Sequence, residues 1–106
     1  MAEQPTISTH VLDAEHGQPM AGVEVALKRH DGGSWLVVGG GTTDEDGRIR
    51  RLIMDDFIEG MYRLEFQVGG RFFDTVALTV KVDDTSRSYH VPLLLAPYSL
   101  TSYRGS

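Results

Sequence analysis

The stretch Tyr62-Arg63-Leu64-Glu65-Phe66-Gln67-Val68 decides the fold class, because its side chains alternate between apolar and polar. Apolar side chains occupy every second position, and charged or amide side chains occupy the positions between them. A period of two residues is typical of a β-strand that turns one face toward a core and the other toward solvent. This stretch therefore predicts a half-buried strand.

The same alternation recurs on both sides of that stretch. It is clear in Val23–Arg29 and Val76–Val82, and neither run has the period of a helix. Less regular candidate strands are Thr6–Asp13, Trp35–Val38, Arg48–Ile53, Tyr89–Leu95 and Tyr98–Tyr103. Glycine, proline and aspartate separate these runs at intervals of about 8–12 residues, which is typical of an all-β sandwich or barrel.

Length and charge limit the possible functions. The 106 residues allow one domain, 1–106, and 10 basic against 15 acidic residues leave a net charge of −5. This balance argues against a nucleic acid or an anionic membrane as partner, because both attract basic patches. The chain has no cysteine, so disulfides and thiolate sites are excluded. Met1–Pro5 shows neither a basic nor an apolar signal region, so we expect a cytoplasmic protein.

Two histidines lie on strands whose second face is also apolar. His10 precedes Leu12 on one predicted outer face, and His90 precedes Leu94 on another. Leucines on outer faces suggest a cover, which in so small a chain is most simply a second subunit. A histidine on a strand is more often structural than functional. Here the two interpretations are about equally favoured, and both stay open at this point.

The other histidines and the metal-ligand spacing are less informative. His16 and His30 fall in predicted turns, where solvent exposure explains them. No histidine or carboxylate lies two or four residues from His10 or His90, and a zinc site needs three or four ligands, so no metal site is expected. Arg48 follows an Asp-Gly turn and gains interest only if it converges on the two histidines.

Several motifs resemble one known family over nearly the whole chain. They are Ile7–Asp13 with Gly17-Gln18-Pro19 and Gly22-Val23, Thr42–Arg48, Tyr89–Leu95 with Pro97-Tyr98-Ser99, and the terminal Tyr103-Arg104-Gly105-Ser106. Together they resemble the transthyretin-like proteins. The terminal Tyr-Arg-Gly-Ser is the most specific part, because within this fold it marks 5-hydroxyisourate hydrolases and is absent from the hormone-carrying transthyretins.

The resemblance implies an architecture. The fold would be a transthyretin-like (prealbumin-like) β-sandwich of seven to eight short antiparallel strands. Such domains dimerise edge to edge and then pair face to face into a homotetramer, a dimer of dimers. The face-to-face contact would cover Leu12 and Leu94. The active sites would lie in that central interface, lined by His10, Arg48 and His90 together with the C-terminal segment.

The resemblance also implies a reaction. It is the hydrolytic opening of the ring of 5-hydroxyisourate, the product of urate oxidation, without a metal or organic cofactor. One of His10 and His90 would act as base for water, because a neutral imidazole titrates near working pH. The other would serve as hydrogen-bonding or relay partner, and Arg48 would clamp the planar substrate. Tyr103, Arg104 and Ser106 would bind substrate. For Arg104 and Ser106, fixing the pocket wall is a further role, and an anchor of the tetramer at the strand end is nearly as well supported.

The sequence departs from the family pattern at two places, and two other functions are possible for this fold. Leu100-Thr101-Ser102 stands where relatives usually have Tyr-Ser-Thr, and Gly69–Thr75 is shorter than the usual connection. The alternative function is a small-molecule carrier of the transthyretin type that uses the same central channel. A carrier of apolar hormones would favour apolar residues where His10, His90 and Tyr103 stand. A structural sandwich with an inactive site would be favoured by a monomeric state.

Overall fold

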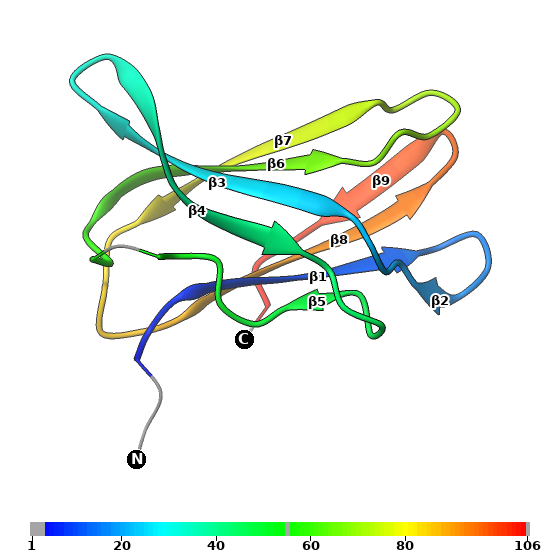
Figure 1. The fold of residues 1–106 in the computed structure, drawn as a ribbon, viewed down its shortest axis with the longest axis horizontal. Helices are drawn as coiled ribbons and strands as arrows, with labels where there is room; N and C mark the ends of the chain where they lie inside the picture. Colours follow the sequence, from blue (N-terminus) through cyan, green and yellow to red (C-terminus); the bar gives the residue numbers. More distant parts are fainter. Residues whose placement is uncertain (1–3, 55, 106) are drawn as a thin grey trace.

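Two β-sheets packed face to face form the computed structural model, which describes residues 4–54 and 56–105 (Figure 1). One sheet has the strand order β4-β3-β6-β7. The other has the order β2-β1-β8-β9, and β5 also pairs with β1. The strands are β1 (Ile7–Asp13), β2 (Gln18–Pro19), β3 (Glu24–Asp31), β4 (Ser34–Thr42), β5 (Arg48–Ile49), β6 (Gly60–Gln67), β7 (Thr75–Val82), β8 (Tyr89–Ala96) and β9 (Ser99–Ser102). The expected all-β sandwich is confirmed.

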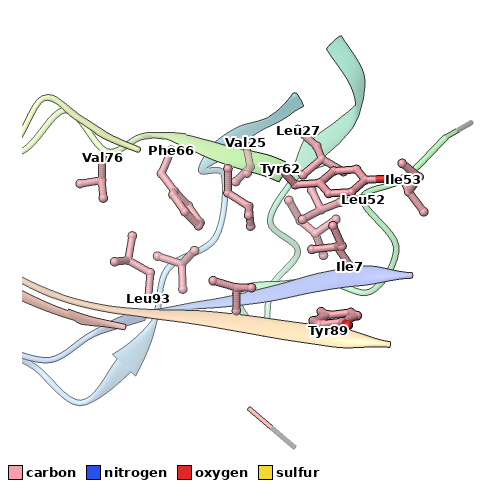
Figure 2. Close-up of a cluster of buried hydrophobic side chains, with 14 of the residues drawn as sticks. Ile7, Val25, Leu27, Leu52, Ile53, Tyr62, Phe66, Val76, Tyr89 and Leu93 are labelled. Carbon is pink, nitrogen blue, oxygen red and sulfur yellow. The ribbon is translucent and has the colours of Figure 1, made fainter. Parts of the chain in front are cut away.

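The period of two residues in the sequence corresponds to the burial seen in the structure. Tyr62, Leu64 and Phe66 of β6 are fully buried, whereas the residues between them are partly exposed. Figure 2 shows Tyr62 and Phe66 facing Ile7 of β1 and Leu93 of β8 across the space between the two sheets. The core is therefore built from the inner faces of both sheets, and the outer faces are left for other roles.

Two details of the sandwich differ from the expectation. The described residues form nine strands rather than seven or eight, and β1 runs parallel to β8 while every other pairing is antiparallel. The strand predicted at Arg48–Ile53 ends at Ile49, apart from a single bridge between Ile53 and Gly39. The strand ends there because Leu52 and Ile53, although consecutive, are both buried and fill the core beside Tyr62 (Figure 2). The side chains of a regular strand would instead point to opposite faces.

The outer face of the β1–β8 sheet is less exposed than the alternation predicts. Leu12 and Leu94 are paired neighbours on this face, and each is partly buried. Pro92, which alternation places on the same face between His90 and Leu94, is buried within the single chain. More strongly exposed apolar side chains lie elsewhere, such as Val37 on β4 at 67% and Phe72 at 68%. No helix within the described ranges has the length and apolar character needed to cross a membrane.

Candidate active site

Strand pairing brings the three polar residues singled out in the sequence to one outer face. In the parallel pair β1–β8, Ser8 lies opposite His90, and in the antiparallel pair β1–β5, His10 lies opposite Arg48. Residues paired across strands share a face of the sheet. An open pocket of about 200 Å³ lies on this sheet and is lined by Ser8, Thr9, Arg48, Ile49, Arg50 and His90.

His10 is oriented by a backbone carbonyl. Its Nε2 lies 2.8 Å from the carbonyl oxygen of Asp46. Because a carbonyl oxygen only accepts hydrogen bonds, Nε2 carries the proton and donates. In the neutral imidazole the other nitrogen, Nδ1, then holds the lone pair and is the acceptor. The turn that presents Asp46 therefore fixes both the direction and the tautomer of His10.

Asp44 holds that turn through its carboxylate and through its own backbone, whose carbonyl accepts from the Gly47 N–H at 2.9 Å and whose N–H donates to the Arg48 carbonyl at 3.0 Å. Asp44 Oδ1 accepts backbone N–H hydrogen bonds from Asp46, at 2.9 Å, and from Arg48, at 3.0 Å. The N–H of Arg48, followed by that of Asp46, holds the pKa of the Asp44 carboxyl below its usual value. Gly47 takes φ +75°, and a Cβ there would lie 2.4 Å from the carbonyl oxygen of Val11. The turn over residues 44–48 thus positions both Arg48 and the Asp46 carbonyl that orients His10.

His90 is held by different neighbours. Its Nδ1 shares a hydrogen bond of 2.9 Å with the hydroxyl of Ser8. The backbone N–H of Gly105 donates to the His90 carbonyl at 2.8 Å, so the tail lies along β8. Burial, and to a smaller extent the charges of Arg48 and His10, lower the pKa of the His90 imidazole. His90 is therefore neutral at neutral pH.

The rest of the terminal segment turns to another part of the molecule. The Arg104 guanidinium lies 4.3 Å from the centre of the Tyr89 ring. With Tyr103 it lines a second pocket, between β7 and the chain end. Within one chain, neither Tyr103 nor Arg104 lines the pocket beside His90. Ser106 lies outside the described residues.

The structure adds residues that the sequence interpretation did not select. Arg50 lines the same pocket as Arg48, and their spacing of two residues in a predicted strand was a usable signal. Asp44 and Gly105 act through backbone contacts, which no side-chain motif reveals. Ser8 is a further residue of this kind, because its pairing with His90 depends on a parallel register that alternation does not predict.

A different group of potential metal ligands lies at the end of β1. Asp13, Glu15 and His16 place one ligand atom each within 4.8 Å of the others. The carboxylate of Asp13 is already engaged, because it accepts two backbone N–H groups and pairs with His16 Nδ1 at 2.8 Å. This pairing raises the pKa of His16. The group is therefore a well-satisfied exposed turn, in line with the prediction that His16 is a turn residue.

A comparison with family models matches residues 7–105 to the model described as the HIUase/Transthyretin family. The chain belongs to this family. The match spans every strand of the sandwich and all three of His10, Arg48 and His90. The expected family is thereby confirmed.

Named relatives and a solved structure add detail. A 5-hydroxyisourate hydrolase of Caulobacter vibrioides is 38% identical over 112 residues, which cover 94% of this chain and 97% of that protein. The Arabidopsis thaliana uric acid degradation bifunctional protein TTL is 40% identical over 122 residues, which cover 97% of this chain and only 38% of the plant protein. The structure of Klebsiella pneumoniae 5-hydroxyisourate hydrolase superposes with a TM-score of 0.84 at 28% identity, covering 96% of this chain and 99% of that one.

Proposed function

We propose that this protein hydrolyses the ring of 5-hydroxyisourate. The observation that carries the proposal is that His10, Arg48 and His90 gather on one face of the β1–β8 sheet, around or beside one pocket. They do so in a chain that matches the Caulobacter hydrolase over nearly its whole length. These groups supply what the hydrolysis of a cyclic amide needs, namely a proton acceptor and a cation.

The two histidines divide the proton transfers between them. Water adds to a ring carbonyl carbon, its proton passes to an imidazole, and the C–N bond breaks as the ring nitrogen takes a proton back. Among the described residues, neither His10 Nδ1 nor His90 Nε2 has a hydrogen-bond partner. These two nitrogens are therefore available, one as base for water and the other as hydrogen-bonding or relay partner.

Arginine supplies the electrostatic part of the mechanism. Arg48 lines the pocket, and its planar guanidinium matches the oxygens of a flat, anionic ring through paired hydrogen bonds. The same cation stabilises the oxyanion that develops when water adds to the carbonyl. Arg50 lines the same pocket and adds a second positive charge there, although the net charge of the chain is −5. This arrangement favours a polar, anionic substrate, and no metal or organic cofactor enters these steps.

The polarity of this face separates the hydrolase from the carrier alternative. A channel for an apolar hormone would bury polar groups without compensation if His10, Arg48 and His90 lined it. The pocket beside His90 contains two arginines and a serine hydroxyl. The observed side chains therefore favour chemistry on a polar molecule over transport of an apolar one.

The proposal includes a homotetramer whose central interface contains the sites. The pocket beside His90 is open to the outside of a single chain, and the partly buried Leu12 and Leu94 lie on the same sheet face as His10. A second copy packed on this face would bury both leucines and exclude water from the pocket. Contact between substrate and Tyr103 or Arg104 also requires a second copy, because both line a different pocket within one chain.

The test is direct. Urate oxidase generates 5-hydroxyisourate from urate in the cuvette, and its ultraviolet absorbance is followed with and without the purified protein. We expect faster decay in proportion to protein concentration. A decay unchanged by the protein would refute the hydrolase. Light scattering on the same sample should give four times the chain mass, and an inactive monomer would instead favour a purely structural sandwich.

A further inference from the structure

The imidazole of His90 is enclosed on two sides by residues from opposite ends of the chain. Ser8, on the parallel neighbour β1, reaches ring nitrogen Nδ1 at 2.9 Å. Gly105, in the C-terminal tail, packs against the ring edge at Cδ2. The ring nitrogen that remains free of both neighbours is Nε2. It belongs to a side chain that lines the pocket.

The need for glycine at position 105 comes from the His90 ring and not from the backbone. Gly105 is absent from the glycines with positive φ, so its backbone conformation is one that other residues also adopt. A Cβ built there would lie 2.5 Å from Cδ2, 3.1 Å from Cγ and 3.2 Å from Cβ of His90. The bond from the Gly105 N–H to the His90 carbonyl, at 2.8 Å, holds the tail at this distance. Any larger residue must therefore displace either the tail or the ring.

Ser8 complements this contact from the other side. The parallel register places it opposite His90 on the outer face, where its hydroxyl meets Nδ1. A hydroxyl rotates to donate to an imidazole nitrogen or accept from it, so it keeps this contact in either tautomer. His90 is thus confined to one rotamer by a hydrogen bond on one edge and by close packing on the other.

We propose that Ser8 and Gly105 are positioning residues, which together hold the His90 imidazole so that Nε2 serves the pocket. The catalytic consequence rests on the proposed hydrolysis. The enclosure of the ring does not, so it is tested without substrate. Neither residue touches the reacting atoms in this scheme, and each acts through His90. The glycine of the Tyr-Arg-Gly-Ser terminus thereby has a defined physical role, which is to pack against the His90 ring.

A double-mutant cycle tests the Gly105 contact. Gly105→Ala, His90→Ala and the double variant are compared by urea denaturation. We expect Gly105→Ala to lower the urea midpoint in the chain that retains His90, and to lower it clearly less in the His90→Ala background, where the contacts at 2.5 and 3.1 Å are gone and only the one with Cβ at 3.2 Å remains. Equal losses in both backgrounds would show that alanine disturbs the tail itself, and would overturn the role of Gly105.

Kinetics and NMR test the Ser8 contact. We expect Ser8→Ala to lower kcat about tenfold with little change in KM, since one hydrogen bond is lost, and Ser8→Thr to restore most of it. The matched control is Ser102→Ala, which removes a hydroxyl that donates to the Pro92 carbonyl at 2.8 Å on the same sheet. The ¹⁵N shifts of the His90 ring should move in Ser8→Ala and stay in place in Ser102→Ala.

The two kinds of measurement separate the possible failures. A wild-type protein without hydrolase activity refutes the proposed function, yet the denaturation cycle and the ring shifts still decide whether the enclosure exists. An active enzyme in which Ser8→Ala matches wild type in kcat and in the His90 shifts overturns the role of Ser8. Gly105→Ala should also reduce kcat, on the order of 10²-fold if the ring moves by about 1 Å.

Discussion

The two halves of the candidate site are built in opposite ways. His10 and Arg48 are oriented by one short turn, in which Asp44 binds the N–H groups of Asp46 and Arg48. His90 is oriented by Ser8, 82 positions earlier in the chain, and by Gly105 in the terminal segment. In the first half the turn is closed by local hydrogen bonds and meets His10, 36 positions before Asp46, through the pairing of β1 with β5. The second half depends on the pairing of β1 with β8 and on the docking of a chain end.

This difference implies that the halves fail for different reasons. A turn closed within a few residues forms with little loss of chain entropy, so the geometry of Asp46 and Arg48 survives changes elsewhere in the sandwich as long as β1 pairs with β5. The contacts of His90 exist only when β1 pairs with β8 and the tail lies along β8. Changes in the turn should therefore affect His10 and Arg48, and changes in the tail should affect His90.

The largest expected effect comes from removing the reacting groups on the turn side. We predict that His10→Asn and Arg48→Ala each lower kcat/KM by roughly 10²–10⁴-fold, the usual contribution of a general base or of a charge-stabilising donor. The decay of 5-hydroxyisourate measures the loss. The oligomer should remain intact in light scattering. Dissociation of the oligomer together with loss of activity would assign these residues a structural role instead.

A smaller effect is expected from Asp44→Ala, which substitutes none of the three site residues. The alanine removes the acceptor for two N–H groups, so the Asp46 carbonyl and Arg48 should both shift. Activity should fall on the order of 10²-fold for a displacement of about 1 Å, while the ¹⁵N shifts of His90, measured at a pH well above its pKa, stay unchanged. Movement of the His90 resonances would contradict the independence of the two halves.

Asp13→Ala is the matched control for Asp44→Ala. Asp13 Oδ1 also accepts two backbone N–H groups, from Glu15 and His16, and hydrogen bonding likewise lowers its pKa. Neither of these partners lines the pocket beside His90. The Asp13→Ala control should therefore lose a comparable pair of turn hydrogen bonds and keep the hydrolase activity.

The two turns should also share a pH dependence. Because both carboxyl groups have lowered pKa values, each turn is fully stabilised above the ordinary aspartate pKa of 3.8 and weakens as the pH falls through the lowered pKa.

Alternation in the sequence predicted the fold well, because one inner face per strand is what a sandwich requires. It identified β3, β6 and β7, and it correctly turned Ile7, Thr9 and Val11 of β1 inward. It overextended the strand at Arg48–Ile53, since buried residues after Arg50 belong to an irregular segment that fills the core. It could not give the parallel pairing of β1 with β8, because periodicity carries no information on strand direction or partner.

The same limit applies to the site. His10, His90 and Arg48 could be selected from the sequence because strand periodicity and family motifs mark them individually. The residues that support them could not, since the bonds from backbone N–H groups to the Asp44 carboxylate and the packing of Gly105 against the His90 ring become visible only in the folded structure. The place of Tyr103 and Arg104 beside a second pocket was also hidden, because sequence does not show on which side of β8 the tail runs. Their predicted contact with substrate remains a prediction.

The smallest expected effect concerns the electrostatic link between the two halves. The charge of Arg48 is the second cause, after burial, of the lowered pKa of His90. We predict that Arg48→Gln raises this pKa toward the ordinary imidazole value of 6.5, as measured by NMR titration of the ring protons. Arg50→Gln is the control, because Arg50 lines the same pocket and is not among the causes of the shift.

The stability of the protein should follow the same titration. Between the lowered pKa of His90 and 6.5, the unfolded chain binds more protons than the folded one, so the free energy of unfolding falls as pH drops through this window. Arg48→Gln narrows this pH window, so the fall in urea midpoint on acidification should be smaller than in the wild type. In Arg50→Gln the fall should equal that of the wild type. An unchanged His90 titration in Arg48→Gln would mean that the charge of Arg48 does not contribute to the lowered pKa of His90. Arg48 and His90 would then be electrostatically separate although they line the same pocket.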